Sequence, residues 1–136
     1  MLDLRGNGGG YLEGAVAIAS LFLKEGTVVS VDRRDTPRME HRVTGQVIEP
    51  TLPLVVLIDG GSASASEIVA GALQDYERAT IVGVKSFGKG TVQELRSLSD
   101  GSKIKLTIAN WVLPDGTIID EKGLEPDIAV ETKDED

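Results

Sequence analysis

Residues 53–67 read PLVVLIDGGSASASE: an apolar run passes through a glycine turn into small residues and a glutamate. The run from Pro53 to Ile58 predicts a strand that is buried on both faces, because a strand with one solvated face would alternate polar and apolar residues. The residues after the turn predict a helix over 67–76, whose small side chains allow close packing. Three serines therefore lie where a buried strand ends and a helix begins.

Strand and helix patterns also alternate on both sides of this segment. Leu2 and Leu4 predict the end of a strand, and apolar residues from Leu12 to Leu23 recur at helical spacing until Gly26. Further strands are predicted over 27–31, 79–84 and 102–112, with a short hairpin strand over 43–49 after a charged loop at 32–40. Residues 91–95 fit a strand and a helix equally well. The alternation predicts an α/β layered domain.

Composition excludes several classes of function. The 136 residues suffice for one domain, and the net charge of −8 repels phosphate backbones, so we expect no nucleic-acid partner. The chain has no cysteine and one histidine, which excludes disulfides, thiolate metal sites and histidine-rich metal sites. We therefore expect no metal. No apolar run reaches the roughly 20 residues of a membrane span, and residues 1–20 lack the pattern of a signal peptide.

Ser64 is the candidate nucleophile. At the start of a helix, the helix dipole favours the negative charge that develops when a serine reacts. The next backbone N–H, here that of Ala65, is placed to point at an oxyanion. The competing interpretation is structural, with Ser62, Ser64 or Ser66 capping the helix. Taken alone, the serine motif favours capping over catalysis.

Lys89 is the candidate general base. A serine hydroxyl is a poor nucleophile and needs a neighbouring base to accept its proton. Lys89 follows Ser64 after one helix and one strand, a path that returns the chain beside the serine. A lysine acts as a base only when it is desolvated, so we expect Phe87 and Val92 to bury it. The alternative is a surface lysine in a turn.

The glycine cluster at residues 6–10 is a further candidate, because its backbone amides are free to face a ligand. A dinucleotide-binding fingerprint would need glycine where the chain has Tyr11. The structural alternative is a tight strand-to-helix turn. The functional alternative is a second oxyanion donor from Gly9 or Gly10, which would complete the hole begun by Ala65.

Two other motifs are weaker. Residues 83–89, GVKSFGK, match the first seven positions of a phosphate-binding loop, but Gly90 stands where a magnesium-binding Ser or Thr is required. Nucleotide binding is therefore a minor alternative, and we expect no cofactor. The single histidine, His41, lies in a charged loop, and we expect it to be solvated rather than catalytic.

The motifs in this order resemble the carboxy-terminal processing peptidases, or tail-specific proteases, a serine-protease family with a Ser/Lys dyad. The resemblance covers nearly the whole chain, and several motifs at compatible spacing outweigh the structural interpretations of each one alone. It rests on residues 2–10 (LDLRGNGGG), 62–68 (SASASEI), 72–75 (ALQD), 87–93 (FGKGTVQ), 113–116 (LPDG) and 123–128 (GLEPDI).

The resemblance implies a serine endopeptidase with a Clp-protease/crotonase-like layered core, acting on polypeptides with free C-termini. Ser64 would be the nucleophile, Lys89 the base and Gln93 the partner that orients the lysine, with Ala65 and Gly10 or Gly9 as oxyanion donors. No cofactor or metal is implied, and a homo-oligomer stays open. The family usually carries a PDZ domain and is exported to the periplasm, cell envelope or thylakoid lumen.

The chain begins inside the predicted strand at Leu2, so we expect the core to be truncated at its N-terminus, without the PDZ domain and the signal sequence. We assign residues 1–130 to the catalytic core and expect the acidic residues 131–136 to be a disordered tail. The alternative to a peptidase is a non-catalytic peptide-binding or assembly fragment that keeps the motif.

Overall fold

The computed structural model of the protein describes residues 1–45 and 47–130. Its first sheet is parallel, with four strands in the order β1-β4-β5-β8. The central strand β4 pairs with β1 through Leu2 and Val56, and with β5 through Val56 and Ile81. No residue of β4 is exposed, as the apolar run predicted. The strands are β1 (Leu2–Asp3), β4 (Val55–Ile58), β5 (Thr80–Gly83) and β8 (Ile128–Ala129).

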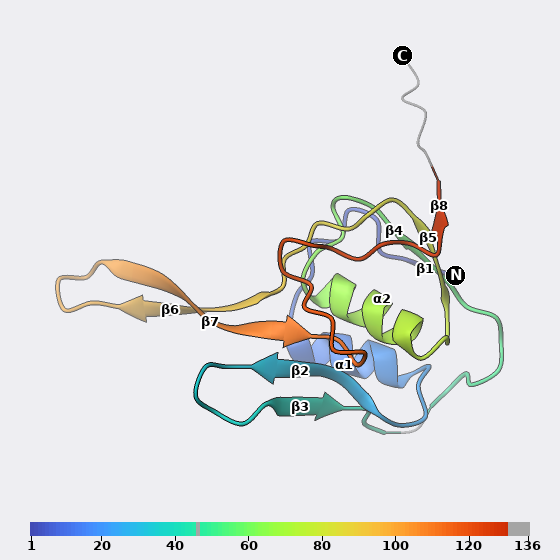
Figure 1. The fold of residues 1–136 in the computed structure, drawn as a ribbon, viewed down its shortest axis with the longest axis horizontal. Coiled ribbons are helices and arrows are strands. Elements are labelled where there is room, and N and C mark those ends of the chain that lie inside the picture. Colours follow the sequence, from blue (N-terminus) through green and yellow to red (C-terminus); the bar gives the residue numbers. More distant parts are fainter. Residues whose placement is uncertain (46, 131–136) are drawn as a thin grey trace, which may run out of the picture.

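The second sheet is antiparallel, in the order β3-β2-β7-β6. β6 and β7 form a long hairpin that projects away from the body of the molecule (Figure 1). The segment that fitted strand and helix equally well is therefore a strand. The bounds are β2 (Thr27–Asp32), β3 (Met39–Arg42), β6 (Thr91–Ser97) and β7 (Lys103–Val112).

The two helices pack against each other between the sheets (Figure 1). α1 spans Leu12–Ser20 and stops before Leu23, and α2 spans Ala65–Asp75, beginning two residues before the predicted start. α2 contacts β5 of the parallel sheet and β2 of the antiparallel sheet. Its small residues are buried there, so the predicted α/β layers are confirmed. None of the helices within the described residues is long and apolar enough to cross a membrane.

The hairpin strand predicted over 43–49 is wrong. The strand that pairs with β2 is β3, where Met39 lies opposite Val31 and Arg42 opposite Thr27. Val43 N–H instead donates to the Gly26 carbonyl. The sequence pattern did not indicate β3, because it contains charged residues. A strand at the edge of a sheet tolerates charge on both faces. The two-residue β8 was not predicted, and the predicted tail at 131–136 lies outside the described residues.

The end of α2 gives a pH-dependent prediction. Asp75 accepts a hydrogen bond from Asp115 N–H, and burial raises its carboxyl pKa from 3.8 to about 6. A raised folded-state pKa stabilises the fold at low pH, and this stabilisation is lost as the pH rises from about 4 to about 6. Asp75→Asn keeps the acceptor and removes the charge.

Between pH 4 and pH 7.5 we therefore expect Asp75→Asn to gain about 1 kcal/mol in unfolding free energy relative to the parent chain, because solvent screens part of the full effect. Urea unfolding of both proteins at the two pH values measures the difference. A difference that does not change with pH would show that Asp75 has the same pKa in the folded and unfolded chains.

Candidate active site

Ser64 occupies a strained turn between β4 and α2. Its φ of 56° and ψ of −118° form a backbone conformation that residues other than glycine rarely adopt. Such strain costs about 1 to 3 kcal/mol and persists where the surroundings hold it, often at active sites. The helix begins at the next residue, Ala65. Ser64 is the N-cap of α2 and forms a capping box with Glu67, as the structural interpretation expected. Its strained backbone distinguishes it from an ordinary cap, which takes an extended conformation.

The three serines of the motif differ in what they contact. Ser62 is 0% exposed, donates from its Oγ to the Leu4 carbonyl at 2.7 Å and accepts from Asp59 N–H at 3.0 Å. Ser66 is 4% exposed, whereas Ser64 is only half-buried. Ser64 is therefore the most accessible serine of this motif.

A buried carboxylate joins the serine turn to the lysine loop. Glu67 is 1% exposed, and its Oε2 accepts both Ser64 N–H, at 2.8 Å, and Lys89 N–H, at 3.0 Å. Its Oε1 accepts Ser86 Oγ–H at 2.5 Å and Gly88 N–H at 2.7 Å. One oxygen thus ties the backbone of the candidate nucleophile to the backbone of the candidate base, although they are 25 residues apart.

Lys89 lies in this loop with its backbone held and its side chain exposed. Burial alternates along the extended segment, with Ser86, Gly88 and Gly90 buried and Phe87 and Lys89 exposed. The predicted burial of Lys89 by Phe87 is therefore wrong in this chain, since Phe87 is itself 65% exposed. No hydrogen bond between Ser64 Oγ and Lys89 Nζ is present in the described residues.

The glycines beside Lys89 serve close packing, as the sequence predicted. A Cβ on Gly90 would lie 2.1 Å from Asp120 N, and one on Gly88 would lie 2.9 Å from Gly123 N. The loop thus packs tightly on the segment that follows β7. Because strand β6 and not a helix follows it, the phosphate-binding alternative is wrong.

The glycine cluster approaches the serine turn closely. A Cβ on Gly9 would lie 2.8 Å from Ser64 Cβ and 2.9 Å from Ala65 N, so only glycine fits there. Gly9 N–H donates to Asn7 Oδ1 at 2.9 Å, and Ala63 N–H donates to the Asn7 carbonyl at 3.0 Å.

Of the two glycine amides predicted to serve an oxyanion, that of Gly9 is therefore already engaged. Among the described residues, the N–H groups of Gly10 and Ala65 donate to no protein group. Two free amides on neighbouring segments, one of them at a helix N-terminus, form a suitable arrangement for binding developing negative charge.

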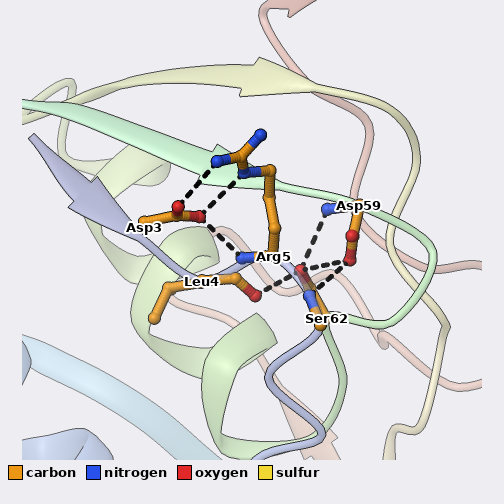
Figure 2. Close-up of polar contacts among 6 residues, drawn as sticks. Asp3, Leu4, Arg5, Asp59 and Ser62 are labelled. Carbon is orange, nitrogen blue, oxygen red and sulfur yellow. Dashed lines mark hydrogen bonds and ion pairs between the residues drawn. The ribbon is translucent and has the colours of Figure 1, made fainter. Parts of the chain in front are cut away.

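A carboxylate scaffold holds the glycine cluster in place (Figure 2). Asp59 accepts Gly6 N–H at 2.8 Å and Gly61 N–H at 2.9 Å, and the first of these hydrogen bonds is the main cause of its lowered carboxyl pKa. Asp3 accepts two hydrogen bonds from the Arg5 guanidinium, which lower its pKa to about 2. The Gly6–Asp59 hydrogen bond thereby joins the turn after β1 to the turn after β4.

Gln93 and His41 do not lie as the sequence analysis expected. Gln93 is exposed on β6, beside a bulge between Val92 and Gln93, and its side chain makes no hydrogen bond with Lys89 or another described residue. Its orienting role stays a prediction. His41 is not fully solvated as expected, because its Nε2 is buried on β3 without a hydrogen-bond partner in the described part of the chain. No group of three His, Asp or Glu side chains suited to a metal occurs within these residues.

A half-buried serine on a strained turn, at the end of a strand and beside two free amides, is typical of hydrolases with a serine nucleophile. The sequence model that describes Peptidase family S41 matches residues 1–130, so the chain belongs to this family.

Relatives agree with this assignment. The chain is 48% identical over 134 residues to a carboxy-terminal-processing protease of Bartonella bacilliformis, and 41% identical to a probable CtpA-like serine protease of Staphylococcus epidermidis. These matches cover 96% and 97% of the chain, but only 30% and 27% of the relatives. The chain thus spans less than a third of the length of these proteins.

The solved structure of a photosystem II D1 C-terminal processing protease superposes with a TM-score of 0.90 at 39% identity. The match covers 96% of this chain and 34% of that one. The expected Clp-protease-like α/β fold is therefore confirmed, together with the predicted family.

Glu67 is the residue whose importance was missed from the sequence. Its position three residues after Ser64 matches the glutamate of a capping box, which predicts a bond back to Ser64 N–H. The other three donors come from residues 86–89, and nothing in the local pattern indicates them.

We expect Glu67→Gln to lower the free energy of unfolding by about 2 to 4 kcal/mol. The amide would turn an NH2 group toward two of the four donors and leave them unpaired while buried. Urea unfolding measures the loss, and exposed Glu25→Gln provides the matched control. If Glu67→Gln and the control have equal unfolding free energies, the hydrogen bonds to both Glu67 oxygens do not stabilise the fold as proposed.

Proposed function

We propose that this chain is the catalytic-core portion of a serine endopeptidase in which Ser64 is the nucleophile and Lys89 the general base. The observation that carries the proposal is the hydrogen bonding of Glu67 Oε2 to the backbone amides of both residues. A structural cap needs no tie to the lysine loop. A dyad does, because proton transfer requires the two side chains within hydrogen-bond reach.

In the proposed reaction, Ser64 Oγ attacks the scissile carbonyl carbon while Lys89 Nζ accepts the hydroxyl proton. The free amides of Ala65 and Gly10 stabilise the resulting oxyanion. The ammonium then returns the proton to the leaving amine as the peptide bond breaks. Water attacks the acyl-enzyme by the same route and releases the product. No step requires a metal or an organic cofactor.

The exposed Lys89 side chain is compatible with this proposal if the bound substrate covers it. An extended polypeptide lying across the site would exclude water from the lysine, and catalytic hydrogen bonds are often long until substrate binds. Gln93, four residues later, would orient the amine. We therefore expect Lys89 to act as a base in the complex with substrate, and its exposure without substrate does not contradict that role.

The substrates we propose are unfolded or extended proteins cut near their C-termini, in keeping with the relative named a carboxy-terminal-processing protease. Such a substrate would add as a strand beside the site. In the full-length protein a PDZ domain would capture the free carboxyl terminus, and we propose export to the cell envelope or thylakoid lumen. Homo-oligomer formation stays open.

The test is cleavage of a disordered protein with a free C-terminus, followed by intact-mass measurement. The parent chain and Ser64→Ala are incubated in parallel, together with a substrate whose C-terminus is amidated. Fragments that require Ser64 establish the peptidase, and their loss on amidation establishes recognition of the terminus. Identical fragments from the parent chain and Ser64→Ala would contradict the proposal.

The second candidate function is a non-catalytic peptide-binding or assembly fragment. It is favoured by one observation, the absence of a hydrogen bond from Lys89 Nζ to Ser64 Oγ or Gln93 in the described residues. This candidate expects a disordered peptide to bind while a serine-directed fluorophosphonate fails to label the chain. Labelling of Ser64 would exclude it.

A further inference from the structure

A small apolar pocket opens between α1 and the beginning of α2, and the two residues that follow Ser64, Ala65 and Ser66, line it. Its volume is about 140 Å³. Both residues whose amides are free for an oxyanion, Gly10 and Ala65, contribute to its wall. A carbonyl group held by these amides would therefore place the side chain of its own residue at the mouth of the pocket. The other walls include Leu4, Tyr11, Gly14, Ile18 and Val69.

Gly14 is the unexplained member of this wall. It lies inside α1, where glycine is a poorer helix former than alanine. Close packing does not account for it, because an added Cβ would meet no atom within 4 Å. Its φ does not require glycine either, since it is absent from the residues with positive φ. Because Gly14 has no side chain, this part of the pocket is open space.

The residues flanking Gly14 define that space. Tyr11, 86% exposed, precedes it by three residues, and Ile18, 39% exposed, follows it by four. Ile18 lies on the same side of α1 as Gly14, whereas Tyr11 is the extended N-cap residue before the helix. Both residues line the pocket. Gly14 thus leaves open space between two large side chains of the wall, those of Tyr11 and Ile18.

We propose that Gly14 sets the size of the substrate side chain accepted at the residue whose carbonyl Ser64 attacks, and that the pocket takes an aliphatic side chain of leucine size. This inference rests on the proposed function of Ser64. The volume is close to the roughly 150 Å³ of an engineered cavity that binds benzene, so a leucine side chain fits.

The chemistry of the lining defines what is excluded. No lining residue carries a charge, so a buried Asp, Glu, Lys or Arg side chain would lose its hydration without gaining a partner. The pocket therefore selects polypeptides with an apolar aliphatic residue before the scissile bond.

The test uses two peptidyl diphenyl phosphonates that differ only in carrying an alanine or a leucine side chain next to phosphorus. Ser64 Oγ bonds to phosphorus, phenoxide leaves, and Lys89 takes the serine proton. We compare the parent chain, Gly14→Leu and Ala17→Leu, because Ala17 is exposed on the same helix but lies outside the pocket lining. A fluorophosphonate without an amino-acid side chain reports the chemistry alone.

We expect the parent chain and Ala17→Leu to react about tenfold faster with the leucine probe than with the alanine probe. In Gly14→Leu this preference is lost, because the added side chain occupies the space that the side chain of the leucine probe would fill. Circular dichroism checks that the parent chain and both variants are folded.

An unchanged leucine preference in Gly14→Leu would overturn the role of Gly14 and leave the proposed function standing. Labelling by the fluorophosphonate without reaction of either phosphonate would overturn the pocket assignment in the same way. A folded parent chain that none of the three probes labels would overturn the proposed function, and the role of Gly14 with it.

Discussion

Ser64→Ala is expected to reduce peptide-bond cleavage by at least about 1,000-fold, because no other group in the proposed mechanism forms the acyl-enzyme. The fold should survive. The backbone N–H of Ser64, which alanine retains, donates to Glu67 Oε2, and losing the hydroxyl side of the capping box at the start of α2 costs about 1 kcal/mol. Alanine at a strained φ costs no more than serine, so unfolding free energies should agree within about 1 kcal/mol.

The measurement is the initial rate of cleavage of a quenched fluorescent peptide, with Ser97→Ala as the control. Ser97 is an exposed serine at the far end of β6 and has no place in the proposed chemistry. Residual activity in Ser64→Ala above a few per cent of the parent would assign the nucleophile to another residue. Equal loss in Ser97→Ala would instead indicate a general effect of the preparation.

Lys89→Met is expected to have a comparable effect, again at least about 1,000-fold on the rate. Methionine keeps an unbranched apolar side chain of similar length and removes the amine. Lys89 N–H still donates to Glu67 Oε2, so the loop keeps its tie to the serine turn. The loss should fall on kcat rather than KM, since the amine acts on the proton and not on substrate affinity.

Two companion variants separate a base from a positive charge. Lys89→Arg keeps the charge but does not give up a proton near neutral pH, so it should be as inactive as Lys89→Met. Lys85→Met removes an exposed lysine of the same loop that is ion-paired with Glu125 at 2.8 Å, and it should keep its activity. Activity in Lys89→Arg near that of the parent would show that Lys89 supplies charge and not a base.

The sequence was informative where the signal is local. The apolar run before Asp59 predicts a central strand, and the serines after it predict the start of α2, because strand burial and helix starts are set by adjacent residues. The close packing of the glycines beside Lys89 was also predictable, since tight backbone contacts admit only glycine.

The remaining features depend on contacts between distant segments. Residues of the Lys89 loop supply three of the four donors to Glu67, and the carboxylate of Asp59 holds the glycine cluster more than 50 residues earlier. The edge strand β3 carries charges that hide its periodicity, and β8 is too short to show any. The exposure of Lys89 follows from which way an extended loop faces, and a sequence pattern does not determine that direction.

The central claim is that Ser64 is an activated nucleophile, and intact-mass analysis after treatment with a fluorophosphonate tests it most directly. The parent chain should gain the mass of one phosphonyl group, and peptide mapping should place it on Ser64. Lys89→Met should be labelled far more slowly, and Ser64→Ala not at all. A folded parent chain that gains no mass, or an adduct mapped to another residue, would contradict the account.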